Sequence, residues 1–301
     1  MRDSLADRRH PITADDDEWK IVNQDSPARV RYAAPKLNKA LATRQKFFPK
    51  DVATAKMKRL WPKFVHSEEE YMAMIKEVAQ LNPRAKTWYK NHQETVKDTF
   101  GIDADIFNMI LGATSPQVGP VTNAQWAVET YLYMLGKRDK PGFMYPNVMK
   151  RQIDRWTRGE YKSVFGKSDQ FKAQEFTRAL LGDKNATVMD RWMNRIFYGQ
   201  PGAQLSVFEH AAGRHMLIRL AKRMTKETGQ KWHPNEVQAN LWVYIRSKIE
   251  GLDIAKSEYD YQTAFNTPIK AFGNMKPLEY LKSQVDENII KQGPVAQFIG
   301  L

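Results

Sequence analysis

An amine and a carboxylate near the middle of the chain are the residues whose types and spacing favour chemistry. Lys172 lies at the start of a helical stretch, and Asp190 follows eighteen positions later, beyond a Gly182-Asp183 break, where a second helix should begin. A carboxylate can stabilise a developing positive charge or activate water, and a lysine with a lowered pKa can attack as a free amine. Each also has a structural explanation, because aspartate is a preferred helix cap and helix lysines are commonly exposed.

The segment that carries both residues resembles the catalytic segment of the helix-hairpin-helix DNA glycosylases, the superfamily that includes endonuclease III. The matching string is VMDRWMNR, from Val188 to Arg195, where the family has V-D-T-H-x-x-R. The resemblance implies that Asp190 stabilises the sugar cation, or activates water, while a flipped base leaves. It also implies that Lys172 attacks the sugar in members that go on to cut the strand. The cleft is expected between the helices of 103–133 and those of 172–198.

The hairpin that gives the superfamily its name departs from the family pattern. Family members carry L-P-G-V-G, whose glycines present backbone N–H groups to phosphate, whereas this chain has GKSDQF at 166–171. Only Gly166 remains, and Lys167 is the expected DNA contact. An alternative alignment places this segment on a helix before the hairpin, which removes the match at Lys172.

A loop and three arginines complete the expected DNA-binding surface. Endonuclease III relatives carry a similar serine-x-glutamine loop that fills the space left by the flipped base. By this resemblance Ser115, Gln117 and Asn123 face the DNA, although an ordinary connection between helices explains the loop equally well. The arginines expected to contact phosphate are Arg191, Arg195 and Arg246, for which an exposed helix face is the alternative.

Hydrophobic periodicity and helix start and stop signals predict an all-α helical bundle that resembles the glycosylase fold. Expected helices lie at 68–81, 85–100, 103–111, 124–135, 147–156, 171–181, 190–198, 207–225 and 234–250, with an irregular loop at 112–120. A polar, proline-interrupted arm is expected at 1–50 and an all-α domain at 51–301. Residues 85–250 resemble a group of bacteriophage proteins that look like remote glycosylases, and this likeness supports the fold more strongly than the reaction.

Composition narrows the class of partner. The chain has 47 Lys and Arg against 34 Asp and Glu, a net charge of +13, which favours DNA. The absence of cysteine excludes disulfides, thiolate metal sites and the iron–sulfur cluster of some glycosylases. The six histidines form no metal signature, so neither a metal nor a cofactor is expected. Because no long apolar run is present, we expect a soluble protein in the cytoplasm of a bacterial or phage-infected cell. Under the glycosylase-like interpretation we also expect a monomer.

These observations leave three functions open. The first is a DNA glycosylase that flips and excises a modified or mismatched base, with or without lyase activity. The second is a DNA-binding protein on a degenerate glycosylase scaffold, which the altered hairpin favours. The third is a phage enzyme that modifies DNA bases on the same scaffold, and such an enzyme would require a small-molecule donor.

Overall fold

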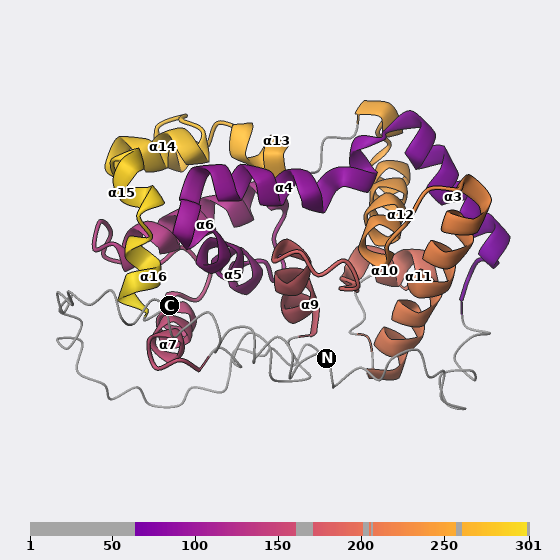
Figure 1. Cartoon of the computed structure of the whole chain (residues 1–301), viewed down its shortest axis with the longest axis horizontal. Helices are drawn as coiled ribbons and strands as arrows, with labels where there is room; N and C mark the ends of the chain where they lie inside the picture. The colour runs from indigo at the N-terminus through magenta and orange to yellow at the C-terminus, as the bar shows by residue number, and fades with distance from the viewer. Residues whose placement is uncertain (1–63, 161–170, 201–204, 206, 257–260, 300–301) are drawn as a thin grey trace, which may run out of the picture.

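The computed structural model describes residues 64–160, 171–200, 205, 207–256 and 261–299, and the regular elements within these ranges are helices (Figure 1). They are α3 (Glu68–Leu81), α4 (Arg84–Phe100), α5 (Ala104–Thr114), α6 (Pro120–Met134), α7 (Pro146–Thr157), α9 (Phe171–Leu180), α10 (Arg191–Tyr198), α11 (Val207–Thr228), α12 (Pro234–Glu250), α13 (Tyr261–Asn266), α14 (Pro277–Gln284), α15 (Glu287–Lys291) and α16 (Pro294–Phe298). Those ranges contain no strand, only an isolated bridge between Ile269 and Met275. The predicted all-α class is therefore confirmed, whereas the arm at 1–50 lies outside the described residues.

The ends of the helices follow local capping chemistry. Ser67 and Glu70 form a reciprocal capping box at the start of α3. Asp190 caps α10 through its side chain. Gly251 ends α12 in the left-handed conformation, with φ of 67°, which glycine adopts without steric cost. All three ends lie where the sequence predicts them.

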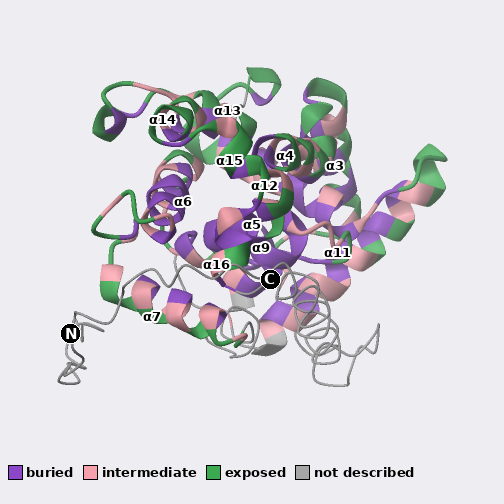
Figure 2. Cartoon of the chain, turned by 60° about the vertical axis from the view of Figure 1, so that its left-hand side comes forward, coloured by how far each residue is buried: buried purple, intermediate pink, exposed green. Residues whose placement is uncertain are grey.

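The helices pack around two large hydrophobic cores. The first is formed mainly by α4, α5, α6, α7, α9 and the helices α13 to α16, and the second by α3, α10, α11 and α12. Figure 1 shows α4 running from one group towards the other. In Figure 2, α5 and α9 lie enclosed among the other helices and are largely buried. Helix α12 joins the two groups, since it packs against α3, α4, α10 and α11.

The segment before α10 crosses the boundary between the cores. Val188 is buried in the first core, and the next residue, Met189, is buried in the second. Asp190 then begins α10. The carboxylate therefore stands where the two groups of helices meet, a common place for a binding pocket.

Two segments differ from the sequence prediction. Helix α5 continues to Thr114 and α6 begins at Pro120, so the loop expected at 112–120 is only 115–119. Pro120 starts the helix because proline is well tolerated in the first turn. Gly112 stays helical and lets α5 approach α9, since a Cβ there would lie 1.8 Å from Thr177 Oγ1. The helices of 261–298 were not predicted, because each is too short to show a clear helical period.

Hydrogen bonds to Asp103 attach α16 to the first core. Its fully buried carboxylate accepts hydrogen bonds from Tyr131 Oη at 2.6 Å, from Val295 N at 3.0 Å and from Ala296 N at 2.6 Å. Burial raises the pKa of Asp103 to about 6, although these three hydrogen bonds oppose the shift.

The described part of the chain has no helix with the length and apolar character needed to cross a membrane.

Candidate functional site

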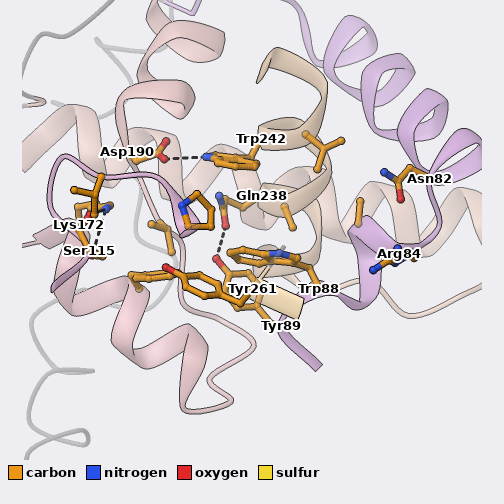
Figure 3. A pocket seen from close by; sticks show the side chains of 17 residues that line it. Asn82, Arg84, Trp88, Tyr89, Ser115, Lys172, Asp190, Gln238, Trp242 and Tyr261 are labelled. Atoms are coloured by element: carbon orange, nitrogen blue, oxygen red, sulfur yellow. Dashed lines mark hydrogen bonds between the residues drawn. The ribbon is translucent and has the colours of Figure 1, made fainter. Parts of the chain in front are cut away.

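A cavity of about 80 Å³ lies at the junction of the two cores (Figure 3). Its wall is formed by helix α4, the 115–119 loop, the first residue of α6, α9, the start of α10, α12 and the start of α13. The lining residues are Asn82, Arg84, Ala85, Trp88, Tyr89, Ser115, Val118, Pro120, Lys172, Phe176, Val188, Asp190, Gln238, Ala239, Trp242, Val243 and Tyr261. Both predicted catalytic residues, Lys172 and Asp190, are among them.

Lys172 places its amine inside the cavity, although the residue as a whole is only partly buried. The amine donates to the carbonyl oxygen of Ser115 at 2.8 Å and to Ser115 Oγ at 3.3 Å. Burial lowers the pKa of Lys172 to about 8; the charge of Asp190 opposes this shift and that of Arg191 adds to it. A larger share of the amine is therefore neutral near pH 7.5 than for an exposed lysine, whose pKa is about 10.4.

Three N–H groups hold the carboxylate of Asp190. Its Oδ1 accepts from the backbone nitrogens of Trp192 at 2.9 Å and Met193 at 3.0 Å, which is the capping interaction. Its Oδ2 accepts from the indole nitrogen of Trp242 at 2.9 Å. Figure 3 shows the bond between Asp190 and Trp242, which lies on α12. A cap requires only the first oxygen, so the bond from Trp242 orients the carboxylate beyond what α10 alone demands.

The remaining wall is rich in aromatic rings, namely Trp88, Tyr89, Phe176, Trp242 and Tyr261. The rings of Trp88 and Trp242 have centroids 6.4 Å apart and planes 25° apart. Trp88 and Phe176 show nearly the same relation, at 6.4 Å and 27°. Flat aromatic walls of this kind stack on planar groups, including nucleobases.

Further polar groups line the cavity, among them Tyr89, Gln238 and Tyr261. Tyr89 Oη donates to Gln238 Oε1 at 2.9 Å, and both residues are buried. The hydroxyl of Tyr261 accepts a short hydrogen bond from the amide of Asn123. These bonds fix polar atoms within an otherwise apolar wall, which is the usual composition of a ligand pocket.

A buried ion-pair network joins the segment of Lys172 to that of Asp190. Arg178 on α9 pairs with Glu175 at 2.8 Å and with Asp183, which begins the loop towards α10. Glu175 also accepts from the backbone nitrogen of Thr187 at 3.3 Å. The network therefore ties α9 to the loop that ends at Asp190.

The predicted loop residues have different environments. Ser115 lines the cavity and holds the amine of Lys172, while Gln117 is exposed at the loop tip with φ of 64°. Asn123 requires a correction, because its side chain is buried behind the loop and cannot face DNA. It bonds to Thr114 Oγ1 at 2.7 Å, to the carbonyl of Leu111 at 3.0 Å and to Tyr261.

The three predicted arginines gather around the indole of Trp192, next to Asp190. Their guanidinium carbons lie 5.2 Å (Arg191), 4.6 Å (Arg195) and 5.9 Å (Arg246) from the ring centroid. Arg246 also lies 5.0 Å from the ring of Trp242 and pairs with Glu250. Cation–π contacts of this kind hold guanidinium groups in place at a surface. The remaining candidate, Lys167, lies outside the described residues.

From the sequence, α12 was not identified as a wall of the site, and Trp242 was given no role in it. Gln238 and Trp242 are four positions apart and therefore share a face of α12. The polar side chain of Gln238, next to the apolar Val237 and Leu241, is the feature of the sequence that could have indicated this wall. The cleft expected between 103–133 and 172–198 is thus only part of the cavity, since α4, α12 and Tyr261 supply the rest.

The model of a family of unknown function (DUF7178) matches residues 75–249, a range that contains Ser115, Lys172, Asp190, Gln238 and Trp242. No curated protein and no solved structure matches the chain. Because the matched range covers more than half of the 301 residues, the chain belongs to the DUF7178 family of unknown function.

Proposed function

We propose that this protein is a DNA glycosylase that flips a modified or mismatched base into the aromatic cavity and excises it. One observation carries the proposal: Lys172 and Asp190 come from different elements and line the same aromatic cavity. A planar base would stack on the rings, and its sugar would lie towards the carboxylate. The net charge of +13 and the arginines beside Asp190 favour a polyanionic partner.

In the proposed reaction the bond between C1′ of the deoxyribose and the base nitrogen breaks. The leaving base takes the bonding electron pair and then a proton from solvent. Asp190 stabilises the positive charge that develops on the sugar, and water adds to C1′ and releases a proton. If the neutral amine of Lys172 adds to C1′ instead, it forms a C–N bond and loses a proton. The C1′–O4′ bond then breaks, and the sugar ring opens to a Schiff base that borohydride reduces to a stable amine.

The test is abasic-site formation on a panel of DNAs that carry normal, damaged or phage-type hypermodified bases. The wild type should release one class of base, and Asp190→Asn should be slower by at least roughly a hundredfold, because it lacks the charge that stabilises the sugar cation. Asparagine can still cap α10 through its one oxygen, but its NH₂ then faces the N–H of Trp242, so a loss of activity assigns Asp190 to the reaction only if the variant folds and binds DNA as the wild type does. Full activity of the variant would remove Asp190 from the mechanism.

One observation favours the non-catalytic alternative, in which the scaffold only binds DNA. Both carboxylate oxygens of Asp190 already accept N–H groups from Trp192, Met193 and Trp242, so the residue also has a purely structural use. This alternative expects salt-sensitive binding without a product on any DNA. A product that forms only when a small-molecule donor is added would instead identify a base-modifying enzyme.

A further inference from the structure

The spacing of two indole rings defines a slot in the cavity. Trp88 on α4 and Trp242 on α12 lie 6.4 Å apart with planes within 25° of each other. A flat ring between two others needs about 7 Å, which is twice a carbon–carbon contact of roughly 3.5 Å. Figure 3 shows the two indoles on opposite sides of the cavity with Gln238 beside the space between them. Because the 6.4 Å distance joins the centroids of rings whose planes differ by 25°, the gap between them is narrower than this distance, and a planar base would enter only after the two rings move apart.

The amide of Gln238 is held in one orientation by Tyr89. The buried phenol donates its proton to Gln238 Oε1 at 2.9 Å. Reversing the amide would leave that proton without an acceptor, and a buried unsatisfied donor costs about 1–3 kcal/mol. Within the described residues the amide nitrogen has no partner, so Gln238 presents an N–H donor to the cavity.

A second cavity residue also offers a donor. When it is protonated, the amine of Lys172 carries three protons and its bonds to Ser115 use two of them. The Oδ2 atom of Asp190 accepts one bond, from Trp242, and keeps a lone pair for a donor of the ligand. Gln238 and Lys172 therefore both offer donors to a ligand.

We propose that this cavity selects a keto base, such as a uracil, thymine or guanine derivative, whose exocyclic oxygen accepts from the Gln238 amide while its ring stacks between Trp88 and Trp242. This inference rests on the proposed function, because it assumes that the cavity receives a flipped base. Amino bases, such as cytosine and adenine derivatives, would direct an exocyclic NH₂ at the same amide and leave two donors facing each other.

The experiment measures the binding of duplex oligonucleotides that carry one 2′-fluoroarabino nucleotide, which resists cleavage, opposite an abasic site. Uracil is compared with cytosine, and guanine with adenine, so that ring size is constant within each pair. Fluorescence anisotropy at one salt concentration gives the dissociation constants. The wild type should bind the keto member of each pair about fivefold to tenfold more tightly, as one neutral hydrogen bond allows.

Three variants separate recognition from folding. Gln238→Glu replaces the donor by an acceptor and should reverse the preference. Tyr89→Phe keeps the ring but frees the amide to rotate, so the two members of a pair should bind about equally. Trp88→Leu removes one wall and should weaken both members by a similar factor of about ten.

The outcomes distinguish this inference from the proposed function. Equal binding within both pairs by the wild type, or an unchanged preference in Gln238→Glu, overturns the keto-base inference. Base release without keto selectivity overturns the keto-base inference but supports the proposed glycosylase activity. Keto-selective binding without release of a base from any natural DNA supports the keto-base inference and contradicts the proposed glycosylase activity. The absence of both selectivity and release overturns both.

Discussion

At the residue scale, the amine of Lys172 has the property that is easiest to measure. Its pKa is lowered to about 8 mainly by burial, against the charge of Asp190 and with a smaller contribution from the charge of Arg191. A lysine in this state reacts with aldehydes at pH values where surface lysines, with pKa values near ~10.4, remain protonated. This reactivity can be observed without DNA and without knowledge of the base.

We predict that reductive trapping of Lys172 by a small aldehyde rises with pH with a midpoint of about 8. The sign follows from the chemistry, since only the deprotonated amine adds to a carbonyl. Mass spectrometry of the peptide that contains Lys172, after reduction by cyanoborohydride, gives the profile. A midpoint near ~10 would show that the amine is solvated rather than buried.

Asp190→Asn should move this midpoint to lower pH, because the negative charge of Asp190 favours the protonated amine. Glu94→Gln is a matched control, since Glu94 pairs with Lys90 on an exposed part of α4. An unchanged midpoint in Asp190→Asn would mean that the two catalytic candidates do not interact.

The roles of some residues of the candidate site could be predicted from the sequence, and those of others could not. Asp190 is visible because capping is local chemistry, readable from an acidic residue before an amphipathic run. The role of Trp242 is not visible, because its bond to Asp190 joins residues 52 positions apart. Asn123 was placed on the wrong side of its loop, since an asparagine near a helix start gives no sign of which way it points.

At the element scale, the close contact of α5 and α9 sets the position of the amine. Gly112 is three residues before Ser115, and Thr177 is five residues after Lys172. A Cβ on Gly112 would lie 1.8 Å from Thr177 Oγ1, 2.9 Å from its Cβ and 3.2 Å from its Cα. The last of these atoms belongs to the backbone, so a side-chain rotation cannot relieve the clash.

Gly112→Ala should therefore push the helices apart and destabilise the protein by about 1–3 kcal/mol, as overpacking does. Urea unfolding measures the loss. Gly119→Ala is the matched control, because a Cβ there meets nothing within 4 Å. The double variant Gly112→Ala/Thr177→Gly moves the glycine to the other helix and should recover part of the loss. Equal stability of Gly112→Ala and the wild type would contradict the close contact.

Helix positions were largely readable from the sequence, but helix lengths near the site were not. The capping box at Ser67 and the Pro234 to Gly251 pair place their helices correctly. The extension of α5 through Gly112 depends on Thr177 in another helix, which no local pattern reports. The short helices after 261 are stabilised by packing on the first core rather than by their own periodicity.

At the scale of the whole molecule, Asp103 links the stability of the fold to pH. Its pKa is raised to about 6 in the folded protein, from 3.8 without burial. Between these values the folded state binds more protons than the unfolded state, so this group contributes stability that is lost as pH rises through about 6. The full difference is about 3 kcal/mol, from roughly two pKa units at 1.36 kcal/mol each.

The free energy of unfolding should therefore contain a component that falls between about pH 4 and pH 6 and is absent from Asp103→Asn. Urea denaturation of both proteins across this range gives the difference between their slopes. The variant should also be less stable at every pH, since its amide NH₂ faces one of the donors Tyr131, Val295 and Ala296. Parallel pH profiles would show that Asp103 titrates normally.

The arrangement of the two cores could not be predicted from the sequence. Periodicity identifies which face of a helix is buried but not which other helix buries it. Val188 and Met189 are adjacent and equally apolar, yet they enter different cores. The resemblance placed Lys172 and Asp190 at one cleft, and the structure lines one cavity with both. The contribution of α4 and α12 to that cavity depends on packing across more than 140 positions.

Trp242 constrains how this site can evolve. The same indole forms one wall of the slot and donates to the carboxylate of Asp190, so a substitution that reshapes the slot there also disturbs the charged group. Trp88 and Gln238 have no such second role, since the hydrogen bonds to the Asp190 carboxylate within the described residues come from Trp192, Met193 and Trp242. Members of this family that have diverged in the ligand they accept should therefore vary at 88 and 238 while retaining tryptophan at 242.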